Sequence, residues 1–405
     1  MFLHGIEHID LPQDLMPAND VVTAVIGLVG TADGTTASQI EHNKLFLVAN
    51  DKDDAKFGEK GTIPEALRAI RLQTSRRGSA LVFVVSVANS SATVTPQQII
   101  GMVDPTGVRT GLKLFETARG IYGFEPMIYI APRFSAIAAV KNELQAIANK
   151  NEAMAYIDSP DGMTFNEALL SRGTTGQFAN LDEGCKLLFP HFLVANPAFN
   201  PEQPESSTNQ KFLNVPMSAY NAGLRAKVDL EQGWHWSSSN HRVFGVEGMD
   251  VDLSFSLGDP TCEANMLNAV GITTAVAIYG RGINEWGNYT TGFPGNTALD
   301  AFECVRRTRA IMKRAIEGAT IPFLDRPFTQ ANVDSIRDSV NQYLNKLVGE
   351  NKLIYGKCFY KPEHNPIINL AVGHLTFLVE YTPCIPMQRL TFLYKINLEQ
   401  LKSIL

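Results

Sequence analysis

Short apolar runs alternate with helical patterns along the first two thirds of the chain. Runs such as VVTAVIGLVG from residue 21 and SALVFVVSV from residue 79 are too apolar for exposed strands and are typical of a parallel sheet covered on both faces. Stretches with apolar residues at helical spacing lie between them. The alternation predicts an α/β domain with a largely parallel sheet, in layers. The predicted strands are 21–30, 45–50, 79–87, 126–132, 153–160, 186–196 and 272–280, and the predicted helices are 62–78, 110–123 and 135–150.

Two segments interrupt or end this alternation. Residues 197–222 are rich in Pro, Ser and Asn and are predicted to form a long surface loop. Near residue 285 the pattern changes to two strong helices, 298–318 and 329–349, followed by strand-like segments. The change predicts a domain boundary there, with a larger α/β domain before it and a smaller α+β domain after it.

The helix at 329–349 has two distinct faces. Its apolar stripe predicts burial on a sheet, with Thr329 as N-cap and Gly349 as the C-terminal stop. The stripe consists of Val333, Ile336, Val340, Leu344 and Leu347. The opposite face is polar and is either solvated or a contact surface. It holds Asp334, Arg337, Asp338, Asn341, Asn345 and Lys346.

The chain closes on a strand pattern. Apolar residues recur at every second position and predict one face of a β-strand, formed by Leu390, Phe392, Tyr394 and Ile396. Pro383 and Pro386 keep the approach to this strand extended. A terminal strand with an apolar face needs partners for that face and for its edge groups, so it is expected to join a sheet.

Composition narrows the class of protein. The 405 residues are 45% hydrophobic and 19% charged, which is ordinary for a globular protein and long enough for two or three domains. The net charge of −6 argues against a nucleic-acid coat, and we expect no direct nucleic-acid partner.

No apolar run approaches the roughly 20 residues of a membrane span, so no membrane insertion is expected. The N-terminus lacks a signal pattern, which predicts a protein made in the cytoplasm. The cysteines are expected to be reduced and mostly buried: Cys185, Cys262, Cys304, Cys358 and Cys384.

One glycine-rich turn resembles a nucleotide site at low resolution. GLVGTADG, from Gly27 to Gly34, follows an apolar strand, and Asp51 lies further on. The glycine spacing does not match GxGxxG, however, and ADGTTAS is turn-like rather than the start of a helix that could hold a pyrophosphate. An α/β nucleotide-binding enzyme that uses this turn remains the alternative hypothesis.

Other clusters of reactive side chains do not complete a site. His235 and His241 lack further metal ligands nearby, and Asp250 and Asp252 are expected on a solvated strand face rather than as an acid–base pair. Five basic residues on the helix at 298–318 predict a solvated face, or contact with an acidic protein surface rather than with nucleic acid. They are Arg306, Arg307, Arg309, Lys313 and Arg314. We therefore expect no catalytic residues, no metal and no cofactor.

Five segments of the second half carry a more specific signal. In order, they are WHWSSSNHRVFGVEGM, DLSFSLGDPTCEANMLNAVGIT, INEWGNYTTG, FLDRPFTQANVDSIRDSVNQYLNKLVGENKLIYG and YTPCIPMQRLTF. Together they resemble the tail sheath proteins of contractile phage tails and of related particles such as R-type pyocins, most closely over 230–395. The chain departs from the family pattern at Ser238, where a proline is common, and at Tyr289, where an arginine is common.

The resemblance implies an architecture and a function. It implies an outer domain at 21–285, an inner domain at 286–385 that faces the tube, and arms at 1–20 and 386–405. The arms would donate β-strands to neighbouring subunits, with Leu390, Phe392, Tyr394 and Ile396 facing the neighbour's core and its edges at 353–361 and 369–381 receiving them.

Head-to-tail links of this kind build helical lattices. The resemblance implies stacked hexameric rings around an inner tail tube protein, which contract to drive the tube through the target cell envelope. Baseplate and tail terminator proteins would be further partners in the virion tail, assembled in the host bacterial cytoplasm. The polar face of the helix at 329–349 would contact the tube.

Overall fold

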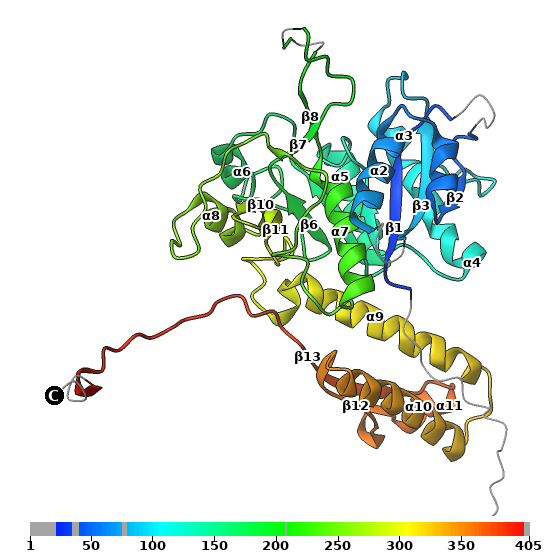
Figure 1. Cartoon of the computed structure of the whole chain (residues 1–405). Helices are drawn as coiled ribbons and strands as arrows, with labels where there is room; N and C mark the ends of the chain where they lie inside the picture. Colours follow the sequence, from blue (N-terminus) through cyan, green and yellow to red (C-terminus); the bar gives the residue numbers. More distant parts are fainter. Residues whose placement is uncertain (1–21, 35–39, 75–78, 204, 207–208, 401–405) are drawn as a thin grey trace, which may run out of the picture.

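The main body of the molecule is built on one twisted sheet (Figure 1). The computed structural model describes residues 22–400 except 35–39, 75–78, 204 and 207–208. Within these residues the large sheet has eight strands in the order β11-β10-β6-β5-β4-β1-β3-β2. The strands are β1 Val25–Thr31, β2 Leu45–Val48, β3 Leu81–Ala88, β4 Ile128–Ile130, β5 Met154–Asp158, β6 Cys185–Leu188, β10 Ile272–Ile278 and β11 Gly282–Trp286.

The predicted largely parallel sheet is confirmed. The six inner strands run parallel, whereas β2 and β11 are antiparallel strands at the two edges. The inner strands are buried on both faces, which explains why their sequences read as continuous apolar runs rather than as alternating patterns.

Helices cover both faces of the sheet and create two cores. One core lies between the sheet and α2 with α7; the other lies between the sheet and α5 with the 3₁₀ helix η2. The predicted helix at 110–123 consists of η2 and α4. The helices of this part are α1 Asp51–Asp54, η1 Ala55–Phe57, α2 Thr62–Thr74, α3 Pro96–Ile100, η2 Gly111–Thr117, α4 Ala118–Tyr122, α5 Ala138–Lys150, α6 Phe165–Ser171, α7 Met217–Glu231 and α8 Glu263–Ala269.

The predicted surface loop at 197–222 is wrong in its second half. Residues Phe212–Val215 form β8, which pairs with β7 (Phe192–Ala195), and β7 also pairs with the short β9 (Gly248–Met249). The buried helix α7 begins at Met217. Its first turn is held by Asp158, whose carboxylate accepts hydrogen bonds from the backbone N and Oγ of Ser218 at 2.8 and 2.6 Å. The β7–β8 hairpin protrudes from the body at the top of Figure 1.

A smaller part follows β11, close to the predicted boundary. It contains α9 (Glu303–Thr320), α10 (Gln330–Gly349) and the antiparallel pair β12 (Leu353–Tyr360) and β13 (Phe377–Pro383). The third hydrophobic core of the molecule lies here, and it joins α9, α10 and β12 with Trp234 of the larger part. Figure 1 shows α9 between the large sheet and the layer of α10 and β12. The remaining helices are η3 Leu299–Ala301, η4 Ile321–Phe323, η5 Pro362–His364 and α11 Ile367–Ala371. The division into outer and inner domains stays a prediction.

Candidate assembly surfaces

The C-terminal arm contacts the body at its root and then leads away from it (Figure 1). Residues 384–397 form neither strand nor helix, and Figure 1 shows this red segment leading away from β13. The apolar side chains predicted to line one strand face are all exposed, with Leu390 at 68%, Phe392 at 71%, Tyr394 at 93% and Ile396 at 85%. Four large apolar side chains in water are unfavourable, so a partner for this face would come from outside the subunit. That the arm pairs with another copy stays a prediction, and the N-terminal arm at 1–20 lies outside the described residues.

The root of the arm is fastened to the body. The hydroxyl of Tyr289 donates a hydrogen bond to Oε1 of Gln388 at 2.7 Å. The Tyr289 ring is stacked on Phe293 and Phe302, with ring centroids 4.0 and 4.6 Å away. The aromatic stacking of Tyr289 gives the arm a fixed point of departure at Gln388.

The β12–β13 pair is a short sheet with open edges. Within the described residues these two strands pair only with each other, in a register that places Cys358 opposite Val379. One face is buried on α10 through Leu353 and Cys358, while Ile354 on the same strand is exposed. The predicted strand at 369–381 is only partly correct, because residues up to Ala371 belong to α11 and β13 begins at Phe377.

The structure confirms the predicted design of α10. Oγ1 of the N-cap Thr329 accepts a hydrogen bond from the backbone N of Asn332 at 3.2 Å, and the helix ends at Gly349. Four of the five residues of the apolar stripe are buried, and Ile336 is half-buried. The third core beneath α10 therefore follows from the sequence pattern.

The six polar residues of α10 are not equivalent. Arg337 pairs with Asp334 at 2.8 Å and with Asp338 at 2.9 Å, and these side chains remain accessible. Asn345 and Lys346 are exposed. The amide of Asn341 instead bonds the backbone of Cys358 in both directions, at 2.7 and 3.0 Å. Asn341 thus joins α10 to β12 inside the subunit, unlike the other five.

The predicted solvated face on α9 is wrong for Arg306, Arg307 and Arg314, whereas the side chain of Lys313 is exposed. Each of its five basic residues pairs with an acidic residue of the same chain, and Arg306 and Arg307 are buried. Four of these contacts join α9 to the larger part, whereas Arg309 pairs with Asp300 of η3, just before α9. The acidic protein surface that the basic helix meets therefore belongs to the same chain. The pairs are Arg306–Glu183, Arg307–Asp229, Arg309–Asp300, Lys313–Glu152 and Arg314–Glu125.

A buried ionic cluster lies at the same junction. Nζ of Lys186 on β6 is 2.5 Å from Oε1 of Glu285 on β11 and 2.7 Å from Oε2 of Glu303 on α9. Ser238 donates its hydroxyl hydrogen to Glu285 at 2.8 Å, and Tyr156 donates to Glu303. The resemblance leads us to expect proline at position 238, and proline could not make the hydrogen bond that the Ser238 hydroxyl donates to Glu285.

Electrostatics favour the ionised forms of Lys186 and Glu303. Burial alone would raise the pKa of Glu303, but Lys186, Arg225 and Arg307 outweigh it and lower that pKa to about 2. Burial would lower the pKa of Lys186, but Glu285 and Glu303 raise it. Sequence reasoning missed this cluster, because Lys186 lies alone within the apolar strand β6 and its partners Glu285 and Glu303 lie 99 and 117 residues further along the chain. The sequence did offer one signal: the isolated charge of Lys186 within the buried strand β6, which needs a partner inside the protein.

The glycine-rich turn serves packing in this fold. A Cβ atom on Gly30 would lie 2.2 Å from Oγ1 of Thr62, the first residue of α2. That hydroxyl also accepts a hydrogen bond from the backbone N of Thr31 at 3.0 Å. Gly30 therefore lets α2 approach β1 closely, which accounts for this glycine without a phosphate.

The two histidines and the two aspartates of the remaining candidate sites do not form pairs. The His235 ring lies between Trp234 and Trp236, and burial lowers its pKa. His241 Nε2 contacts Gln232 Oε1 at 3.0 Å. Asp250 and Asp252 are not on a strand, because β9 ends at Met249; this part of the strand prediction is wrong. Asp250 accepts a hydrogen bond from the backbone N of His191 at 2.8 Å.

The cysteines agree with the prediction. All five are free thiols, four of them buried and Cys384 partly exposed. Within the described part of the chain, no helix combines the length and the apolar composition that crossing a membrane requires.

Comparison with known proteins identifies relatives along the whole chain. A family model for the central domain of phage tail sheath proteins matches residues 107–291. The chain is 32% identical to the tail sheath protein of Burkholderia phage BcepMu, over 100% of this chain and 98% of that protein. It is also 32% identical to the major tail sheath protein of Serratia phage KSP20, over 97% of this chain and 94% of that protein.

The fold is also similar to that of solved structures. The cryo-EM structure of the anti-feeding prophage helical sheath in its contracted state matches with a TM-score of 0.69. The match covers 98% of this chain and 100% of that chain at 17% sequence identity. At this identity the likeness describes the fold, which extends over both parts of the molecule.

Proposed function

The chain belongs to the family of tail sheath proteins, and we propose on this basis that it is a structural subunit of a contractile tail sheath. The observation that carries the proposal is the similarity to tail sheath proteins over the full length of the chain. Sheath proteins are structural rather than enzymatic, so the comparisons do not favour the nucleotide-binding alternative at Gly27–Gly34. The protein would be part of a virion tail, assembled in the host cytoplasm.

Assembly would depend on the C-terminal arm. We propose that Leu390, Phe392, Tyr394 and Ile396 face the core of a neighbouring copy, whose β12–β13 pair has an open edge to receive the strand. Two features support this: the exposure of the four side chains and the absence of further pairing of β12 or β13 among the described residues. Main-chain hydrogen bonds would link the copies, and the alternating side chains would fix the register.

Contraction would move subunits largely as rigid bodies. The ion pairs of α9 and the buried cluster around Lys186 hold the two parts of the subunit together, which supports this view. Movement would then be concentrated beyond Gln388, where the fastened root ends and the exposed arm begins. Subunits would form stacked hexameric rings, and shortening of the lattice would drive the tube through the target envelope.

The inner tail tube protein would contact α10. Asp334, Arg337, Asp338, Asn345 and Lys346 are the residues we assign to this surface, whereas Asn341 is engaged by β12. Exposed ion pairs contribute only about 0–1 kcal/mol each, so a polar surface would release the tube readily. Baseplate and tail terminator proteins would bind the ends of the assembly.

Electron microscopy of the purified full-length chain tests this function. A sheath subunit should form long hollow tubes, alone or after addition of the tube protein. An α/β enzyme should remain as monomers or small closed oligomers under the same conditions. Failure to form tubes in both mixtures, across protein and salt concentrations, would contradict the proposal.

A further inference from the structure

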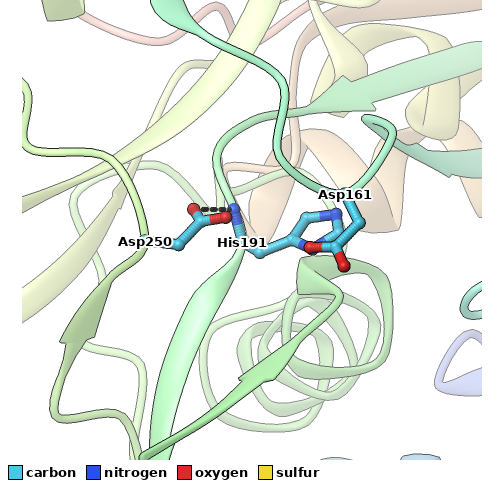
Figure 2. Close-up of side chains that lie close together, drawn as sticks. All are labelled: Asp161, His191 and Asp250. Carbon is cyan, nitrogen blue, oxygen red and sulfur yellow. Dashed lines mark hydrogen bonds and ion pairs between the residues drawn. The ribbon is translucent and has the colours of Figure 1, made fainter. Parts of the chain in front are cut away.

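Three side chains with metal-binding chemistry meet at the root of the protruding hairpin (Figure 2). Asp161 follows β5, His191 precedes β7, and Asp250 follows β9. One potential ligand atom of each lies within 4.8 Å of those of the other two. Nδ1 of His191 is 3.5 Å from Oδ1 of Asp161. Segments far apart in the sequence therefore bring one imidazole and two carboxylates together.

The hydrogen bonds of His191 fix its tautomer. Nε2 lies 2.8 Å from the backbone oxygen of Ser159. A carbonyl oxygen can only accept, so Nε2 carries a proton, and whenever the ring is neutral Nδ1 presents its lone pair to Asp161. Nδ1 of His191 and Oδ1 of Asp161 are then two hydrogen-bond acceptors that face each other, and the His191 ring is largely buried. A proton or a cation between the two atoms would stabilise this arrangement. A carbonyl partner on the far nitrogen is also the usual support of a metal-binding histidine.

Neighbouring groups orient both carboxylates. The backbone N of His191 donates to Oδ1 of Asp250 at 2.8 Å. Nδ2 of Asn214 on β8 donates to Oδ1 of Asp161 at 2.6 Å and to Oδ2 of Asp250 at 3.1 Å. The Oδ1 atom of the same amide is buried and has no hydrogen-bond donor among the described residues.

The surrounding cations are engaged elsewhere. Among the described residues, neither Asp161 nor Asp250 forms an ion pair with lysine or arginine. Arg133 reaches the backbone oxygen of Asn214 at 3.3 Å, but its guanidinium pairs with Glu65. Two carboxylates thus lie close together without a fixed positive charge between them, which favours binding of a cation.

We propose that Asp161, His191 and Asp250 bind a first-row divalent cation with the ligand preferences of zinc. An imidazole with two carboxylates is a mixed nitrogen and oxygen set, suited to zinc-like ions rather than to magnesium or calcium. Zinc bonds of about 2.0–2.2 Å place neighbouring ligand atoms roughly 3.3 Å apart, close to the spacing of His191 and Asp161. The cation would fasten the root of the β7–β8 hairpin to the loop after β5.

Zinc titration of the full-length chain, after treatment with a chelator, tests the site. Calorimetry should detect saturable binding of Zn²⁺ with about one ion per chain, and thermal unfolding should shift upward with added Zn²⁺ but not with Mg²⁺. The Asp161 side chain is 75% exposed, so Asp161→Asn should fold like the parent in the presence of chelator. It should bind Zn²⁺ at least about tenfold more weakly.

A matched control separates this site from surface histidines. His364 is exposed and distant in the sequence, so His364→Ala should bind Zn²⁺ as the parent does. His191→Gln, which retains a hydrogen-bond donor, should lose the high-affinity site together with the thermal shift. The proposal is wrong if the parent shows no saturable binding, or if Asp161→Asn and His191→Gln both bind Zn²⁺ as tightly as the parent.

Discussion

Lys186 and Glu303 form an ion pair of 2.7 Å in which both side chains are almost completely excluded from solvent. Lys186 lies on β6 in the large sheet, and Glu303 is the first residue of α9. The pair therefore joins the body to the helix that leads into the smaller part. Because isolated charges are costly inside a protein, the two residues depend on each other and on Glu285.

Removal of the lysine charge should destabilise the fold strongly. Lys186→Met leaves two buried glutamates without their cation, and loss of one partner of a buried pair typically costs about 3–5 kcal/mol. Urea denaturation should detect this as a lower free energy of unfolding. Lys44→Met removes a partner from the exposed Lys44–Glu41 pair and should change that free energy by about 1 kcal/mol or less. Equal effects of the two substitutions would contradict the burial of the cluster.

Acid should weaken the same junction. The pKa of Glu303 is lowered from its ordinary value of 4.5 to about 2, so the ionised form stabilises the folded state at pH values above 4.5. This contribution decreases as the pH falls from 4.5 toward 2. The free energy of unfolding should therefore fall more steeply in that range for the parent than for Glu303→Gln. Denaturation at several pH values would measure both slopes, and identical slopes would refute the assignment.

Deletion of residues 387–405 should abolish assembly without unfolding the subunit. The four alternating side chains are 68–93% exposed in their own subunit, so their loss removes little buried surface. Circular dichroism should show a folded protein with a cooperative transition, and microscopy should show no tubes. If the strand belonged to its own core, four losses of about 2–5 kcal/mol each would unfold the domain.

Substitutions on the two faces of the arm sharpen this test. Phe392→Asp places a charge on the face that would enter the neighbour's core, whereas Thr391→Asp places it on the opposite face. Tubes should be lost with the first and retained with the second. The same outcome for both variants would contradict a strand with one buried face.

Charge reversal on α10 should weaken assembly around the tube protein. Arg337→Glu combined with Lys346→Glu changes only accessible side chains, so the monomer should stay folded. Co-sedimentation of subunit and tube protein should decrease, with a difference that depends on salt concentration because exposed charges are screened. Lys44→Glu on the larger part is the matched control. Normal co-sedimentation of the double variant at every salt concentration would exclude α10 as the tube contact.

The hairpin should tolerate a short insertion where α7 does not. Four glycine and serine residues inserted between Pro201 and Glu202 lie in a surface turn and should leave soluble, assembling protein. The same insertion between Asn221 and Ala222 interrupts the buried helix α7 and should abolish folding. Solubility and tube formation of the two variants measure the difference, and loss of soluble protein with the hairpin insertion would show that this turn is structural.

The sequence pattern predicts those elements whose burial is uniform along the segment. The strands β1, β3 and β5 are buried throughout and read as apolar runs, and α10 has a regular stripe above its core. Helix α7 escaped prediction because its first turns contain Ser218 and Asn221, which are polar yet fully buried. The buried hydroxyl of Ser218 donates a hydrogen bond to Asp158, which lies 60 residues away in the sequence. A local sequence pattern cannot predict such a contact.

The ion pairs of α9 and the cluster of Asp161, His191 and Asp250 also depend on contacts between residues far apart in the sequence. The basic residues of α9 look solvated in sequence, since their acidic partners lie as far away as Glu125 and Glu152. Alternation alone predicts a strand with an apolar face in the arm, but residues 384–397 form neither strand nor helix in the subunit, so this strand stays a prediction. The cluster of Asp161, His191 and Asp250 was not predictable from the sequence, since three separate loops bring its members together.

The exposed arm and the open β12–β13 pair lie on one chain, so in the proposed assembly every copy has one strand to donate (the plug) and one sheet edge to accept a strand (the socket). A copy that lacks residues 387–405 keeps the socket and loses the plug. Such a copy could enter a growing row but could not hold the next one, and it would act as a chain terminator. A small fraction of truncated copies mixed with full-length protein would then shorten the assemblies far more than their proportion implies.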